Sequence, residues 1–401
     1  MFFLGGFILR ITYVARSFLD YRIPVLEQLN KLCENKLRFI SSTKLTPQRC
    51  IDRLQHTLGS NAIFLTGEKS FGTDVPNEAN KSICLPYQPG LVKTILGTKP
   101  DVLIGDGFFQ WTSAALLLRA LKGIPLVVCY ERWAHTERNV QWFRKIYRKF
   151  ALRFTDAVCC NGSLSKKYTI SLGMPSARIT TGHMAADTEQ LAASLSKVAD
   201  AEKSMLRGEY QLVGTVFLYV GRLVPMKGIA PLLDAWAEFE KTIADATLLV
   251  VGGGPEEQAL KEQQVRLGLE RVRFAGPIDY TRMSLFYAVS DVFIMPTLED
   301  NWSLVVPEAM ACGLPILCSK YNGCWPELVR EGDNGWVFDP LNSADTLRVL
   351  STAANSCGRF PGMGQLSMKI VEDYSPIKAA LSIMNACEIA NKRTQKGFSD
   401  D

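Results

Sequence analysis

Short apolar runs alternate with amphipathic segments along the whole chain. The runs that predict buried strands lie at 7–14, 61–66, 102–104, 125–130, 157–160, 179–182, 216–220, 247–251, 272–275, 292–295 and 316–318. Segments with apolar positions at helical spacing lie between them, at 24–32, 112–121, 166–172, 190–210, 304–310 and 377–391. This alternation is typical of parallel sheets covered by helices, so we predict an α/β protein with doubly wound sheets.

The length of 401 residues predicts two domains, because a single hydrophobic core rarely grows that large. A charged stretch with few apolar residues near 205–212 predicts the linker. We therefore expect an N-terminal domain at 1–208 and a C-terminal domain at 209–376. Doubly wound sheets bind ligands at the carboxyl ends of their strands, so the polar residues that follow the apolar runs are the candidates for function.

Composition narrows the class of protein. The net charge of +5 permits an anionic ligand or membrane surface, and it does not predict a nucleic-acid partner. The eleven cysteines form no Cys-x-x-Cys pair, which predicts reduced thiols in a cytoplasmic chain and no metal site. Arg10 interrupts the apolar start, and no uncharged apolar run is long enough to span a membrane.

A loop with glycine and two bases follows the apolar run 216–220. It reads Gly-Arg-Leu-Val-Pro-Met-Lys-Gly from Gly221 to Gly228. Arg222 and Lys227 place two cations beside the predicted start of the next helix. Fixed cations and the free amides of a helix start can neutralise phosphates, so the loop predicts a diphosphate site. The alternative is an ordinary loop with two exposed bases.

A second loop brings together two carboxylates. Asp300 follows the predicted strand 292–295, and Glu308 lies on the predicted helix 304–310. If Ser303 caps this helix, the first helical amides point back toward the loop. Glu308 comes about two helical turns after Asp300, so both carboxylates can border one pocket.

The order of these motifs resembles that of family-4 glycosyltransferases with the GT-B fold. That family has an acidic residue, seven residues and then a Glu that leads into Ala-Met-Ala-x-Gly-x-Pro, and Asp300 and Glu308 occupy the two acidic positions. The usual first acid of the family is Glu followed by Gly-Phe-Gly, which this chain replaces. The resemblance is close over 213–340 and loose before it. It implies two Rossmann-like domains that face a cleft, with 377–401 crossing back to the first domain.

The resemblance also implies roles at the donor site. Arg222 and Lys227 would hold the diphosphate of a nucleotide sugar, and Glu308 would accept hydrogen bonds from the ribose hydroxyls. Asp300 and the amides after it would hold the transferred sugar. The backbone that follows 272–275 would recognise the base of the nucleotide. The full set of further donor contacts is Gly221, Gly276, Pro277, Ile278, Asn301, Trp302, Ser303 and Leu304.

The N-terminal half departs from the family pattern at two places. Many members have a Gly-Gly loop after the first strand, whose amides approach the diphosphate, and this chain has Arg16 and Arg22 there as candidate substitutes. Glu131 stands where many relatives have a His that faces the transferred sugar, and His135 follows. We expect Glu131 or His135 to contact substrate. The alternatives are solvated arginines and an ordinary surface or core histidine.

Residues 138–154 contain six basic residues, five aromatic residues and no acid. This composition is typical of a helix that lies on an anionic membrane surface. The alternative is a helix that turns its aromatic side to the core and its basic side to water. The first interpretation predicts a cytoplasmic protein peripheral to the membrane.

The resemblance implies a hexosyltransferase that uses a UDP- or GDP-linked sugar. The resemblance implies retention of anomeric configuration and no requirement for a metal, and no Asp-x-Asp pattern is present. No cofactor is expected beyond the donor itself. The acceptor would be a glycan or a lipid-linked molecule in cell-surface polysaccharide synthesis. The alternatives are another GT-B enzyme, such as a nucleotide-sugar epimerase, and a non-catalytic protein that binds nucleotide sugars.

Overall fold

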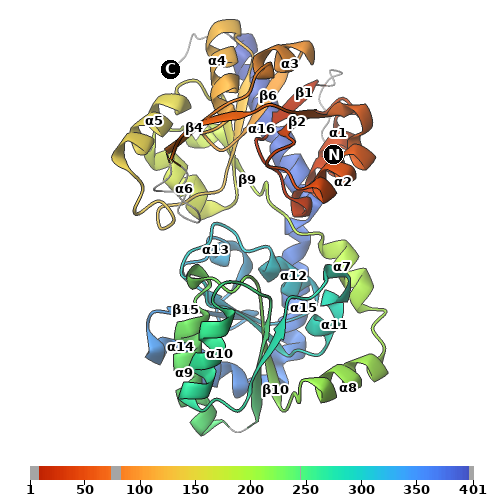
Figure 1. Ribbon diagram of the computed structural model, residues 1–401, viewed down its shortest axis with the longest axis vertical. Helices are drawn as coiled ribbons and strands as arrows, with labels where there is room; N and C mark the ends of the chain where they lie inside the picture. The colour runs from red at the N-terminus through yellow and green to blue at the C-terminus, as the bar shows by residue number, and fades with distance from the viewer. Residues whose placement is uncertain (1–8, 74–82, 244, 397–401) are drawn as a thin grey trace. The chain divides into compact units, whose positions relative to one another are not determined.

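The computed structural model describes residues 9–73, 83–243 and 245–396 (Figure 1). Contacts divide the chain into two compact units. Unit 1 comprises Met1–Ala185 and Pro376–Asp401, and unit 2 comprises Ala186–Ser375. Each unit is described by itself.

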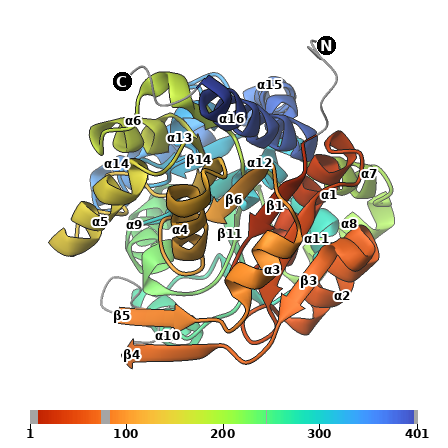
Figure 2. The same cartoon turned by 90° about the horizontal axis from the view of Figure 1, so that it is seen from above.

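Unit 1 is built on a seven-stranded parallel sheet of order β3-β2-β1-β6-β7-β8-β9. Its strands are β1 (Ile11–Val14), β2 (Arg38–Ser42), β3 (Ala62–Leu65), β6 (Val102–Asp106), β7 (Leu126–Tyr130), β8 (Ala157–Cys160) and β9 (Ile179–Thr181). Its helices are α1 (Ile23–Leu32), α2 (Gln48–Leu58), α3 (Leu91–Gly97), α4 (Thr112–Lys122), α5 (Trp142–Leu152), α6 (Ser163–Ser171) and α16 (Pro376–Lys396). An antiparallel hairpin of β4 (Lys69–Thr73) and β5 (Ile83–Tyr87) extends away from the sheet (Figure 2).

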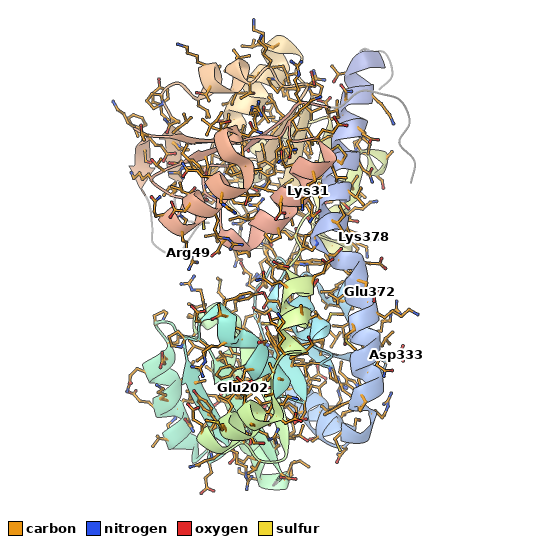
Figure 3. The ribbon with its side chains drawn as sticks, turned by 90° about the vertical axis from the view of Figure 1, so that its right-hand side faces the viewer. Lys31, Arg49, Glu202, Asp333, Glu372 and Lys378 are labelled. Carbon is orange, nitrogen blue, oxygen red and sulfur yellow. The ribbon has the colours of Figure 1, made fainter. Side chains whose placement is uncertain are left out.

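Helices cover both faces of this sheet, which explains why its central strands are continuous apolar runs. One core lies between the sheet and α1, α2 and α16, and the other lies beneath α3, α4, α5 and α6. Helix α16 lies along α1, where Lys31 is labelled in Figure 3. The last helix of the chain thus completes the core of the first unit, as the resemblance implied.

Unit 2 has a six-stranded parallel sheet of order β12-β11-β10-β13-β14-β15. Its strands are β10 (Thr215–Val220), β11 (Ala246–Val251), β12 (Val272–Gly276), β13 (Val292–Met295), β14 (Ile316–Ser319) and β15 (Gly335–Phe338). Its helices are α7 (Thr188–Leu195), α8 (Asp200–Glu209), α9 (Ile229–Thr242), α10 (Glu257–Leu267), α11 (Met283–Ala288), α12 (Val305–Ala311), α13 (Trp325–Leu328), α14 (Ser343–Ala354) and α15 (Phe360–Val371).

Short 3-10 helices join several of these elements. They lie at Asp20–Arg22, Gly59–Asn61, Ser176–Arg178, Pro225–Lys227, Tyr280–Arg282, Cys357–Arg359 and Glu372–Tyr374. Both sheets reverse their strand order at one point, between β1 and β6 in unit 1 and between β10 and β13 in unit 2. The predicted class, a doubly wound α/β protein with two Rossmann-like units, is confirmed.

Some element boundaries differ from the sequence prediction. The unit boundary lies at Ala185 rather than near 208, because α7 packs on α11 and α12, and Arg207 of α8 donates to the carbonyls of Val289 and Gly214. The predicted single helix at 190–210 is therefore two helices of unit 2. The first strand begins at Ile11, and the part of its prediction before residue 9 lies outside the described residues.

Two further observations concern the chain as a whole. Across the described ranges, no helix is both long and apolar enough to cross a membrane. The same part of the chain contains no group of three or more His, Cys, Asp or Glu side chains that could hold a metal ion.

Candidate active site

The loop after β10 is tied to the loop after β13 in unit 2. Gly228 has φ +70°, and a Cβ atom there would lie 2.1 Å from the carbonyl oxygen of Pro296, so only glycine permits this approach. The Met226 carbonyl accepts hydrogen bonds from the Thr297 hydroxyl at 2.9 Å and from the Leu298 amide at 2.7 Å. These contacts hold the two loops side by side at the carboxyl edge of the sheet.

This attachment brings a cation and an anion together. Lys227 Nζ lies 2.5 Å from Asp300 Oδ2, and both side chains are mostly buried. Ser303 Oγ donates to the same oxygen at 2.5 Å. Ser303 is thus not the cap of α12, which begins after Leu304 without a side-chain cap, because its hydroxyl is engaged by Asp300.

The backbone around Asp300 is equally fixed. The Asp300 amide donates to the Tyr321 carbonyl at 3.2 Å, and the Gly323 amide donates to the Asp300 carbonyl at 3.0 Å. Asp300 Oδ1 accepts from the Trp302 amide at 3.0 Å. Asn301 Oδ1 and Trp302 Nε1 are buried and have no hydrogen-bond partner. This loop therefore fixes the position of the Asp300 carboxylate, while Asn301 Oδ1 and Trp302 Nε1 remain without hydrogen-bond partners.

Glu308 occupies the first turn of α12 between two tyrosines. Its Oε2 accepts from the Tyr287 hydroxyl at 3.0 Å, and its Oε1 accepts from the Tyr280 hydroxyl at 3.3 Å. Burial raises the pKa of Glu308 to about 7, although both hydrogen bonds favour the ionised form. The carboxylate is thus poised to change its charge near neutral pH.

The other expected donor contacts lie around the same edge. Arg222 is exposed, and no ion pair joins it to an acid in the described parts of the chain. Gly276 ends β12 with φ +73°, and its carbonyl accepts from the Gly252 amide at 2.8 Å. Pro277 is exposed and Ile278 is half-buried. Unit 2 therefore gathers the predicted donor residues at the carboxyl ends of β10, β12 and β13 and the start of α12.

In unit 1, Arg22 is not a solvated loop residue. Its Nη1 lies 2.8 Å from Asp106 Oδ2, its Nη2 donates to the Tyr13 hydroxyl at 2.6 Å, and its guanidinium lies 4.7 Å from the Phe18 ring centroid. His183 lies in the same neighbourhood, with Nε2 buried and without a hydrogen-bond partner. Burial, followed by the charge of Arg22, lowers the pKa of His183 to about 3, so this imidazole is neutral.

Arg16 is also paired. Its Nη2 lies 2.9 Å from Glu68 Oε1, and Glu68 Oε2 accepts from Trp111 Nε1 at 2.9 Å. Glu131 follows β7 and acts electrostatically on Arg22. The His135 ring is 5.4 Å from the Trp133 ring. The structure thus places Arg22 and Glu131 in one neighbourhood and fixes Arg16 against β4.

Helix α5 presents Ile146 and three of its four aromatic residues to solvent. The exposed fractions are 75% for Trp142, 40% for Phe143, 57% for Ile146 and 53% for Phe150. In Figures 1 and 2 the helix lies at the periphery of unit 1. The interpretation that its aromatic side lies in the core fits only Tyr147, which is half-buried and stacks on Phe109. The buried residues of this helix are Arg148, Ala151 and Leu152.

Two family models together match most of this chain. "Glycosyltransferase Family 4" matches residues 65–190, and "Glycosyl transferases group 1" matches residues 211–354. The chain belongs to glycosyltransferase family 4. Its resemblance to that family, inferred above from the motifs around Lys227 and Asp300, is confirmed.

Individual relatives of this family-4 glycosyltransferase match it in part. Sulfoquinovosyl transferase SQD2 of Arabidopsis thaliana is 23% identical over 80% of this chain and 62% of its own length. A GDP-mannose-dependent alpha-(1-6)-phosphatidylinositol monomannoside mannosyltransferase of Mycolicibacterium smegmatis is 34% identical over 31% of this chain and 34% of its own. Each match thus covers less than two thirds of the relative. The structure of Anabaena HepE in complex with UDP has a TM-score of 0.74 at 18% identity, covering 95% of this chain and all of HepE, which supports the GT-B fold.

Several residues of the candidate site escaped the sequence analysis. Tyr280 and Tyr287 gave no signal, because nothing in a pattern shows which tyrosines face Glu308. Asp106 did carry a sequence signal, because it ends a buried strand at the carboxyl edge of the sheet. His183 carried the same kind of signal, because it directly follows the predicted strand 179–182, and it was overlooked.

Proposed function

We propose that this glycosyltransferase is a retaining hexosyltransferase that moves a sugar from a nucleotide-diphosphate donor to a glycan or lipid-linked acceptor in cell-surface polysaccharide synthesis. The observation that carries the proposal is the pair of Lys227 and Asp300, with Arg222 and Glu308 at the same edge of unit 2. A cation for the diphosphate and carboxylates for hydroxyl groups are the two kinds of group that a nucleotide sugar requires.

The proposed reaction breaks the bond between the sugar C1 and the diphosphate oxygen. Lys227 and Arg222 stabilise the charge that develops on the departing diphosphate, and Asp300 accepts hydrogen bonds from hydroxyls of the transferred sugar. The acceptor hydroxyl attacks C1 on the face that the diphosphate leaves, and its proton passes to the leaving group. Retention in this manner requires no base on the opposite face of the sugar.

The names of the relatives indicate which donors to test first. HepE has been crystallised with UDP-glucose, and the mycobacterial mannosyltransferase depends on GDP-mannose. A thermal-shift panel of UDP-, GDP- and ADP-linked sugars, with and without EDTA, would identify the donor and test the expected independence of metal. The protein incubated with donor alone should leave the donor intact, whereas conversion of the donor sugar would indicate an epimerase.

We also propose that the protein acts at the cytoplasmic face of a membrane and contacts it through residues 138–154. Exposed apolar side chains alternate with Arg144, Lys145 and Lys149 on one helix, which suits an anionic lipid surface. The ten cysteines whose side chains the structure describes are free, which fits a reducing compartment.

A further inference from the structure

The two tyrosines that hold the Glu308 carboxylate differ in their surroundings. Tyr287 is 1% exposed, and its ring lies 6.4 Å from the ring of Phe293, which is fully buried. Tyr280 is 49% exposed, and its hydrogen bond to Glu308, at 3.3 Å, is longer than the 3.0 Å bond of Tyr287. Loss of the Tyr287 bond would leave a buried hydroxyl group without a partner, whereas the Tyr280 hydroxyl would face water. Tyr280 is therefore the partner that a ligand can replace.

The position of Tyr280 in the chain places it beside the segment expected to recognise the base. The 3-10 helix Tyr280–Arg282 directly follows the loop 277–279, whose last residue is Asp279. Asp279 fixes this turn, because its Oδ1 accepts a hydrogen bond from the Thr281 amide at 2.9 Å. Tyr280 thus connects the loop expected to recognise the base to the carboxylate expected to bind the ribose.

A nucleoside matches both the hydroxyl and the ring of Tyr280. The ribose hydroxyls are donors of the same kind as a phenol, so one of them can replace the Tyr280 hydroxyl on Glu308. The base is flat, and bases stack favourably on exposed aromatic rings. A phosphate group would instead be repelled by ionised Glu308 and by Asp187, whose charges act on this tyrosine. The chemistry around Tyr280 therefore favours the nucleoside over the diphosphate.

We propose that Tyr280 binds the nucleoside of the donor and exchanges its bond to Glu308 for a contact with the base. In the unliganded protein its hydroxyl donates to the carboxylate. When the nucleotide binds, a ribose hydroxyl takes that place and the tyrosine ring packs against the base. The exchange keeps a donor on Glu308 Oε1 in both states, so the carboxylate oxygen is not left unpaired. This inference rests on the proposed function, because it assumes that the nucleotide binds at Glu308.

The test compares Y280F, Y280A and Y287F with the wild type, by calorimetry with UDP, GDP, ADP and inorganic pyrophosphate at pH 8. Y280F should bind its nucleotide about threefold more tightly, because no phenol competes for Glu308. Y280A should bind it at least about tenfold more weakly, because the ring is lost. Y287F makes the same chemical change at the tyrosine that stays in place, so it should gain no affinity. Pyrophosphate has neither ribose nor base, so its affinity should not change in Y280F or Y280A.

The pH dependence of binding separates this role from a structural one. Burial raises the pKa of Glu308, the hydrogen bonds of Tyr287 and Tyr280 lower it, and the charge of Asp187 raises it. Cys312, one turn later on α12, stays protonated because burial raises the pKa of its thiol. Without the Tyr280 hydroxyl, the rise of nucleotide affinity with pH should therefore move to higher pH in Y280F.

Each part of the inference has a result that would overturn it. If Y280F gained no affinity and kept the pH profile of the wild type, the exchange at Glu308 would be wrong. Unchanged nucleotide binding by Y280A would overturn the role of the ring, and so would a parallel loss of pyrophosphate binding, because the whole site would then be disturbed. A wild type that binds none of the nucleotides would overturn the proposed function itself. Thermal unfolding of each variant verifies that it is folded.

Discussion

Lys227 Nζ lies 2.5 Å from Asp300 Oδ2, although 73 positions separate the two residues in the chain. The cation expected to hold the diphosphate is thus already paired before a donor arrives. An incoming diphosphate must share this ammonium group with Asp300. The pair therefore couples diphosphate binding to the carboxylate that we assign to the transferred sugar.

Asp300→Asn should have opposite effects on diphosphate binding and on sugar transfer. Affinity for the free nucleoside diphosphate should rise by a few fold, because Lys227 loses a competing anion, as expected for a partly exposed ion pair. Turnover should fall, because the transferred sugar loses a charged acceptor. Calorimetry with the nucleotide and a transfer assay measure the two effects. If nucleotide affinity and turnover both fell, the proposed coupling between Lys227 and Asp300 would be contradicted.

Removal of either cation should slow transfer. Lys227→Ala or Arg222→Ala should lower turnover by about 100-fold or more, because a preorganised charge no longer stabilises the leaving diphosphate. Both variants should remain folded, since Arg222 is exposed and Lys227 is held by one pair. Lys241→Ala, which removes an exposed lysine of α9, is the matched control. Wild-type rates in both active-site variants would show that the diphosphate binds elsewhere.

Glu308 should make donor binding depend on pH. Its pKa of about 7 means that it becomes fully charged only above neutrality, and a charged acceptor bonds to ribose hydroxyls more strongly than a neutral one. Nucleotide affinity should therefore rise as pH increases from 6 to 8, and Glu308→Ala should weaken binding and remove this dependence. Titrations of the nucleotide into the wild type and into Glu308→Ala, from pH 6 to 8, measure this dependence. A pH-independent wild type would refute the ribose role.

The same carboxyl group predicts an effect on stability. Its folded pKa lies above the ordinary value of 4.5, so the folded state binds the proton more tightly than the unfolded state does. The free energy of unfolding should therefore fall as pH rises from 4.5 to 7, by less than about 1.4 kcal/mol per pH unit. Glu308→Gln should lack this decline. Urea unfolding at several pH values compares the two proteins, and identical slopes would argue against the raised pKa.

The sequence predicted the regular elements better than the contacts between them. Strands such as 292–295 were recognisable because burial on both faces makes them continuously apolar. The loop at Asp300 was recognisable by its motif. The ion pair with Lys227 was not, because it depends on Gly228 packing against Pro296 far along the chain. The unit boundary was misplaced because the charged helix α8 resembles a linker until its packing is known.

Membrane attachment can be tested on α5. A variant with Glu at Arg144, Lys145 and Lys149 should be released from anionic liposomes, since each base near such a surface contributes about 1 kcal/mol. Co-sedimentation with neutral and anionic vesicles compares it with the wild type. Equal pelleting of both proteins, or of neither, would indicate a soluble acceptor.

The pair of Arg22 and Asp106 should contribute to the stability of unit 1. Asp106→Ala would leave a largely buried guanidinium without its carboxylate and should cost about 3 kcal/mol. The double variant with Arg22→Met should recover part of that loss, because the uncompensated charge is gone. Chemical unfolding measures both. A single variant as stable as the wild type would mean that Tyr13 alone satisfies Arg22.

Helix α16 determines the order in which the two units can fold during synthesis. Six of its residues, from Ala379 to Ala390, belong to the same core as α1, yet the ribosome makes them after all of unit 2. Unit 2 is contiguous and can fold while synthesis continues, but unit 1 must wait with an open hydrophobic face until the final helix emerges. A chain that ends at residue 375 and is released from the ribosome should therefore have a protease-resistant unit 2 and a unit 1 that recruits chaperones.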